Sequence, residues 1–168
     1  MTLPRESIVE KYGQQLRHAA CGNEAAFQYL VSFICVLHAW DDLIDKDRPV
    51  ADADIHEAFL EALINIPRNP FYRNHQDRLC DVTENSVLQW LTANVWERAD
   101  QIDGIEAQVA FIIRSNYVEA VTTVALICGG MQHAIDINLT LRPLAHWEGV
   151  GRYLENLQTE KEARDNVL

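Results

Sequence analysis

Apolar residues recur along the chain at helical rather than alternating spacing. From Glu24 to about Lys46 they fall on almost every face of a predicted helix, at Phe27, Leu30, Val31, Phe33, Ile34, Val36, Leu37 and Trp40. A helix that is apolar all round belongs in the interior of a bundle. A second strongly apolar stretch, about 105–128, predicts another central helix. No segment alternates cleanly over the length of a strand, so the pattern predicts an all-α fold.

Glycine, proline and asparagine divide this pattern into six or seven expected helices. Gly22 ends the first helix and Asn23 caps the second, Pro49 follows the end of the second, and the pair Gly129-Gly130 ends the fifth. The expected helices cover residues 5–20, 24–46, about 52–66, 83–102, 105–128, 131–137 and 144–163. The 168 residues contain no linker or repeat, so we expect residues 1–168 to form a single helical domain.

Charge and cysteine content narrow the classes of partner and compartment. The formal net charge of −11 and the lack of a basic cluster argue against nucleic-acid binding. The four cysteines lie far apart, which is typical of free thiols in a reducing compartment. The N-terminus lacks a signal-peptide pattern, and the longest apolar runs are too short to span a bilayer. We therefore expect a cytoplasmic protein without a membrane partner.

An acidic run lies at the end of the first central helix. His38, Asp41, Asp42 and Asp45 have i, i+3, i+4 and i+7 spacing, which places them on one helix face. Three like charges on a C-terminal turn repel one another and oppose the helix dipole. A hard cation would compensate them, because Mg²⁺ takes carboxylate oxygens and bridges readily to phosphates. We therefore predict Asp41, Asp42 and Asp45 as Mg²⁺ ligands.

The same run has a simpler interpretation that needs no metal. The aspartates can form a solvated helix end that pairs with Lys46 and Arg48. On either interpretation, His38 is expected to be a packed or hydrogen-bonded core histidine rather than a ligand.

A second polar group interrupts the other apolar stretch. Ser115, Asn116, Glu119, Thr122 and Thr123 share one face of the predicted fifth helix. A carboxylate with an amide and hydroxyls beside it inside an apolar run predicts either a hydrogen-bonded network or the wall of a pocket. As a pocket wall, Asn116 and Glu119 would face the aspartates and act as the catalytic residues. A further pair, Glu97 and Asp100, stands one turn apart near the end of the predicted fourth helix.

The stretch Phe33-Ile-Cys-Val-Leu-His-Ala-Trp-Asp41-Asp42-Leu-Ile-Asp45 resembles the first DDxxD motif of the trans-isoprenyl diphosphate synthases and class I terpenoid synthases. In that family the motif also ends a long apolar helix. The resemblance implies that Asp41 and Asp45 coordinate Mg²⁺ ions that hold a substrate diphosphate, while Asp42 helps to shape the site. It further implies an apolar helical pocket for an isoprenoid chain.

The same acids also resemble the metal-binding pairs of the all-α nucleoside triphosphate pyrophosphatases of the MazG and dimeric dUTPase type. Asp42-x-x-Asp45 and Glu97-x-x-Asp100 are similar to the acidic pairs that this family places on neighbouring helices around Mg²⁺. This resemblance implies hydrolysis of a nucleotide.

A third interpretation is a non-enzymatic interaction protein. Exposed apolar helix faces would then form a homodimer or partner interface, with Trp90, Trp96, Trp147 and Tyr153 as candidate anchors, although a core position is expected for most of them. Among the three, we favour Mg²⁺-dependent binding or turnover of a diphosphate-bearing small molecule at the aspartates. Whether the chain is an enzyme stays open at this point.

Overall fold

The computed structural model describes residues 5–45, 49–99, 102 and 104–165, with side chains as far as residue 159. The all-α prediction is confirmed, since these residues include no strand. They form eight α-helices of five or more residues rather than six or seven. The elements are α1 (Arg5–Ala19), α2 (Glu24–Asp45), α3 (Asp52–Leu60), the π-helical η1 (Glu61–Asn65), α4 (Ile66–Arg68), α5 (Pro70–Asn74), α6 (Gln76–Glu97), α7 (Gly104–Ile113), α8 (Tyr117–Ala145) and α9 (Gly149–Asp165).

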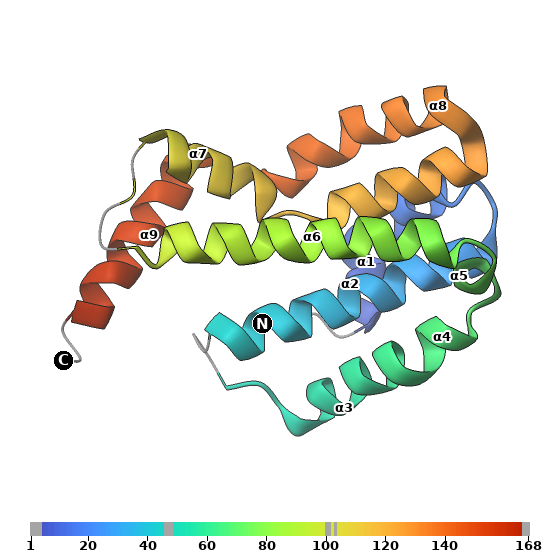
Figure 1. Ribbon diagram of the computed structural model, residues 1–168, viewed down its shortest axis with the longest axis horizontal. Coiled ribbons are helices and arrows are strands. Elements are labelled where there is room, and N and C mark those ends of the chain that lie inside the picture. The colour runs from blue at the N-terminus through green and yellow to red at the C-terminus, as the bar shows by residue number, and fades with distance from the viewer. Residues whose placement is uncertain (1–4, 46–48, 100–101, 103, 166–168) are drawn as a thin grey trace.

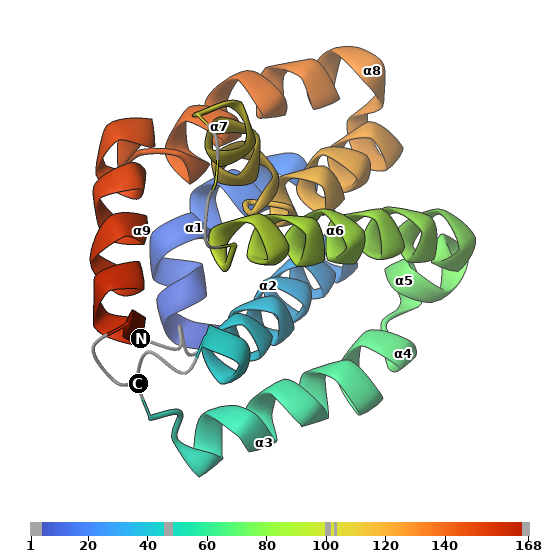
Figure 2. The same cartoon turned by 60° about the vertical axis from the view of Figure 1, so that its left-hand side comes forward.

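Helix α2 runs through the middle of the bundle (Figure 1). It lies between α6 on one side and the α3–η1–α4 segment on the other, and α1 packs against both α2 and α8 (Figures 1 and 2). The stretch of α2 from Tyr29 to Cys35 is buried on all sides, which confirms it as a central helix. Its C-terminal half is different, because Trp40, Leu43 and Ile44 are each more than a third exposed. The end that carries the aspartates therefore emerges from the core into a more open part of the molecule.

The start of α2 is set by a local signal. Asn23 Oδ1 accepts a hydrogen bond of 3.1 Å from the backbone N–H of Ala26, which satisfies one of the free donors at the helix N-terminus. Gly22 just before it has a φ of 79°, a left-handed conformation that suits glycine at the end of a helix. The predicted boundary between the first two helices is thus confirmed.

Two later boundaries differ from the prediction. Helix α6 begins at Gln76 rather than near Thr83, because the short α5 leads directly into it. The expected fifth helix is broken, since α7 ends at Ile113 and α8 begins at Tyr117. The break is held by two bonds between buried residues: Asn116 Nδ2 donates to the carbonyl of Ser86 at 2.7 Å, and Ser86 Oγ donates to the carbonyl of Asn116 at 3.3 Å. A contact with α6 therefore ends a helix that local sequence would continue.

Helix α8 is bent into two arms at Gly130. This residue has φ 81° and ψ −176°, which is non-helical, and the chain turns there so that the second arm runs back along the bundle (Figure 1). The first arm is strongly buried through Val118, Val121 and Val124. The predicted stop at the glycine pair is confirmed as a sharp turn, and the prediction of a second central helix holds for the first arm.

The geometry of Gly130 gives a testable expectation. Its combination of φ and ψ is essentially restricted to glycine, so Gly130→Ala is expected to lower the free energy of unfolding by about 2 kcal/mol through backbone strain. Space is not the cause, because an added Cβ would have no neighbour within 4 Å. Gly151→Ala is the matched control, since Gly151 has equal space and lies inside α9 without a positive φ. Urea unfolding of both variants checks this; equal stabilities would contradict it.

Helices α2 and α8 are long and apolar enough, by length and composition, to cross a membrane. Half of the apolar window of α2 is buried within the bundle, and a third of that of α8. The turn at Gly130 also divides α8 into shorter arms. In the described chain both helices pack in the bundle, α2 against α1 and α3 and α8 against α1 and α6.

Candidate functional site

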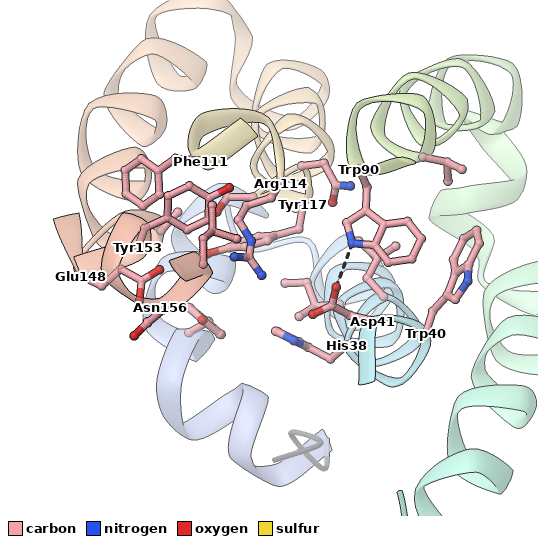
Figure 3. A pocket seen from close by; sticks show the side chains of 18 residues that line it. His38, Trp40, Asp41, Trp90, Phe111, Arg114, Tyr117, Glu148, Tyr153 and Asn156 are labelled. Carbon is pink, nitrogen blue, oxygen red and sulfur yellow. Dashed lines mark hydrogen bonds between the residues drawn. The ribbon is translucent and has the colours of Figure 1, made fainter. Parts of the chain in front are cut away.

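A cavity of about 340 Å³ opens beside the C-terminal half of α2. It is enclosed by residues of α1, α2, α6, the α7–α8 junction and α9 (Figure 3). Six of its lining residues are aromatic, namely Tyr12, Trp40, Trp90, Phe111, Tyr117 and Tyr153. Within the described part of the chain, its charged lining residues are Asp41, Arg114 and Glu148. A concave site in which a few polar groups converge beside apolar and aromatic side chains is the usual form of a small-molecule site.

Asp41 is the member of the acidic run that lines this cavity. The indole N–H of Trp90 on α6 donates a hydrogen bond of 2.8 Å to Asp41 Oδ1 (Figure 3). The Trp90 ring also packs at 5.3 Å, centroid to centroid, against that of Trp40, one residue before Asp41. These contacts fix the orientation of the carboxylate at the cavity wall.

Arg114 enters the cavity from the break between α7 and α8. Its guanidinium points into the space between Tyr153 and Asp41 (Figure 3). Nη1 lies 3.6 Å from Glu97 Oε1, and the phenol of Tyr153 donates to the same oxygen at 2.6 Å. Burial alone would lower the pKa of Arg114, but the carboxylates of Glu97, Asp41 and Asp45 raise it. The guanidinium is therefore a permanent cation that the surrounding carboxylates hold in place.

His38 lines the cavity one turn before Asp41. Its Nε2 atom is buried and has no hydrogen-bond partner among the described residues. Burial, with a smaller effect of Lys11, lowers the pKa of His38 to about 4, so the ring is neutral near pH 7. A buried polar atom without a partner is uncommon in folded proteins. The expected packed or hydrogen-bonded core histidine is thus found as a packed one at this nitrogen, and the ring lies in the wall of the cavity.

The other two predicted metal ligands do not line the cavity. Asp45 Oδ1 lies 3.2 Å from the guanidinium of Arg98 at the end of α6, and Asp42 is half-buried on α2. Across the part of the chain that is described, no group of three or more His, Cys, Asp or Glu side chains is placed to hold a metal ion. Lys46 and Arg48, the cations of the solvated-end interpretation, lie outside the described residues.

Asn116 and Glu119, which were predicted to face the aspartates together, lie in different parts of the structure. Asn116 lines the cavity, and its amide is engaged with Ser86 as described above. Glu119 is not among the lining residues of the described chain, and it pairs with Arg142 of the second α8 arm at 2.7 Å. Thr122 and Asn138 continue that link between the two arms. The structure thus places Asn116 at the site and Glu119 in a contact within α8.

The acidic pairs of the pyrophosphatase interpretation are brought together in part. The Arg98–Asp45 ion pair places the C-terminal end of α6 beside that of α2. Glu97, however, bonds to Tyr153 and Arg114, and Asp100 lies outside the described residues. A metal site formed by Asp42, Asp45, Glu97 and Asp100 together, as in the pyrophosphatases, therefore stays a prediction.

Sequence reasoning missed Arg114 and Tyr153 as site residues. Arg114 lies far from Asp41 along the chain, and it carries no motif. One signal was present, since Arg114 is a charged residue at the end of the strongly apolar segment Gly104–Ile113. A partly buried cation needs partners, and here Glu97 provides one at 3.6 Å, while Asp41 adds to the negative charge around it.

Comparison of the chain with protein-family models, with curated proteins and with solved structures gave no significant match. The resemblance of the acidic run to the DDxxD motif therefore stays a prediction.

Proposed function

We propose that the cavity binds a small molecule that carries a phosphate or diphosphate group, with Mg²⁺ between that group and Asp41. The observation that carries the proposal is that one aromatic-lined cavity holds a permanent cation, Arg114, and His38, whose buried Nε2 has no partner among the described residues. Arginine binds phosphate through paired N–H donors, and a neutral histidine can donate one further hydrogen bond.

The charges of the cavity favour a bridging cation. Asp41 and Glu148 outnumber Arg114 among the charged lining residues, so a free anion would meet net repulsion. Mg²⁺ is usually held by one or two carboxylates together with phosphate oxygens and water, and it does not need a cage of protein ligands. Asp41 fits that role at the cavity wall, and Asp42 is the nearest second carboxylate along α2. When bound, Mg²⁺ would neutralise phosphate charge next to Asp41.

The rest of the ligand is expected to be apolar or planar. The walls formed by Tyr117, Phe111 and Trp90 present aromatic faces and edges, and a prenyl chain or an aromatic ring would bury its surface against them.

Calorimetric titration tests the proposal with three probes, each with and without Mg²⁺: inorganic pyrophosphate, geranyl diphosphate and a simple aliphatic amine. We expect Mg²⁺-dependent binding of the diphosphates, tighter for geranyl diphosphate. Asp41→Asn keeps an oxygen acceptor for Trp90, yet it should weaken binding about tenfold or more through loss of the charge. Arg114→Gln should weaken it to a similar degree.

Asp136→Asn and Arg152→Gln are the matched controls, because both residues are exposed and lie outside the cavity lining. They should bind as the unchanged protein does. Absence of diphosphate binding, or equal binding by Asp41→Asn and the controls, would overturn the proposal. Binding of the amine without Mg²⁺ would instead assign the site to organic cations.

A further inference from the structure

The side of α2 opposite the cavity carries an apolar groove. Its lining consists of Val36, Ala39, Trp40 and Leu43 of α2, Ile55, Ala58 and Phe59 of α3, and Ala62 of η1. We call these eight residues the α2–α3 groove. None of them is charged or carries a polar side-chain atom other than the indole nitrogen of Trp40. A groove of this kind on a chain with a net charge of −11 is an unusual feature of its surface.

An apolar ridge stands at the edge of the groove. Phe59 is 57% exposed and Leu63, one turn further along η1, is 66% exposed. Leu60 between them is also more than half exposed. On the other side of α2, helix α6 presents a stripe of exposed Leu88, Leu91 and Val95 at i, i+3 and i+7 spacing. The layer formed by α6, α2 and α3 (Figures 1 and 2) therefore carries apolar side chains on all three helices.

We propose that this surface is the interface of a homodimer, in which the Phe59–Leu63 ridge of each copy lies in the α2–α3 groove of the other. A twofold interface uses the same patch on both copies, so the patch must be complementary to itself. A ridge and a groove side by side on one surface meet that requirement.

The exposed area is large enough for a stable dimer. With Trp40, Leu43 and Ile44 of α2 included, the exposed apolar side chains of the three helices present on the order of 900 Å². A stable interface of standard size buries about 800 Å² per partner. Phe59 and Trp40 are the large aromatic residues of this surface, of the type that usually dominates binding energy.

The charges favour a second copy over an anionic lipid surface. Asp52 and Asp54 at the start of α3 and Asp45 at the end of α2 surround one end of the groove. These carboxylates would repel anionic lipid. In a dimer they would repel each other across the rim, so added salt should tighten the dimer by screening them.

The proposed interface is also linked to the cavity. Trp40 is shared by the lining of the cavity and that of the groove, and it packs on Trp90, which in turn bonds to Asp41. Dimer formation would therefore fix the tryptophan pair that supports the cavity wall. The dimer itself does not depend on what the cavity binds.

Sedimentation equilibrium over a concentration series tests the dimer. The unchanged protein is expected to sediment with twice the chain mass of 19.2 kDa at high concentration. Leu63→Glu and the double change Phe59→Glu with Leu63→Glu should sediment as monomers. Met131→Glu and Leu139→Glu on the second arm of α8 are matched controls, since these residues are 66% and 69% exposed, and both should stay dimeric.

A monomeric unchanged protein at every soluble concentration would overturn the proposal. A dimer that persists in Leu63→Glu, while this variant keeps the melting temperature of the controls, would overturn it as well. Flotation with vesicles of anionic lipid tests whether the same surface binds a membrane. Vesicle binding by the unchanged protein that is lost in Leu63→Glu would assign the surface to a membrane instead.

Discussion

Replacing Arg5 by methionine is expected to lower the free energy of unfolding by about 3 kcal/mol, because it leaves the carboxylate of Glu61 buried without its cation. Arg5 Nη1 lies 2.7 Å from Glu61 Oε1, and the Glu61 side chain is only 5% exposed. The same guanidinium also donates to Ser32 and Gln28 of α2. Arg5 thus joins α1, α2 and η1 at one point, and its loss affects all three contacts.

Urea unfolding measures this effect, and Arg73→Met is the matched control. Arg73 is exposed at the surface, so its replacement should change stability by less than about 0.5 kcal/mol. The double change Arg5→Met with Glu61→Met should recover a large part of the loss, because no charge is then left buried. A loss below about 1 kcal/mol in Arg5→Met would match an ordinary surface pair and contradict this assignment.

Stability is expected to fall as the pH is lowered from about 6.5 to about 4, in part because His38 resists protonation in the folded state. Burial lowers its pKa to about 4, whereas an unfolded histidine has a pKa of about 6.5. Between these values the unfolded chain binds a proton that the folded chain does not, so acid favours unfolding there. At pH 4.5 this single group should remove on the order of 2–3 kcal/mol relative to pH 7.5.

Urea unfolding of the unchanged protein and of His38→Gln at pH 7.5 and 4.5 isolates this contribution. The variant should lose less stability between the two pH values, because it has no group to protonate at position 38. Burial also lowers the pKa of His146. Because His146 is present in both proteins, its effect on stability cancels when the two are compared. Equal pH dependence of the two proteins would show that His38 titrates normally in the folded state.

The part of the fold that the sequence predicts well is the part controlled by local signals. Asn23 caps α2 as expected, and the apolar residues that cover all faces of α2 place it in the core. The turn at Gly130 follows from a conformation that only glycine adopts readily. In each case the residues that decide the structure are neighbours in the sequence.

The boundary between α7 and α8 could not be found in this way. Residues 114–116 contain no glycine or proline, and the flanking segments have strong helical patterns. The chain breaks there because Asn116 and Ser86 exchange two hydrogen bonds between distant helices. A tertiary contact therefore overrides the local preference.

The site was predicted in part for the same reason. The acidic run identifies the end of α2 as unusual, and Asp41 does line the cavity. The partners that define the cavity come from α6, the α7–α8 junction and α9, and their positions depend on the fold. Arg114 in particular enters the same cavity as Asp41 from the break just before α8.

The indole N–H of Trp90 offers the most direct test of ligand binding at Asp41. Its hydrogen bond to Asp41 Oδ1 makes its NMR resonance a reporter of that carboxylate, and Trp90→Phe assigns the signal among the four tryptophans. Addition of Mg²⁺ and pyrophosphate to ¹⁵N-labelled protein should shift the Trp90 signal more than that of the exposed Trp147, and Asp41→Asn should abolish the Mg²⁺-dependent part. A Trp90 signal that stays in place at saturating Mg²⁺ and pyrophosphate would contradict the proposed site.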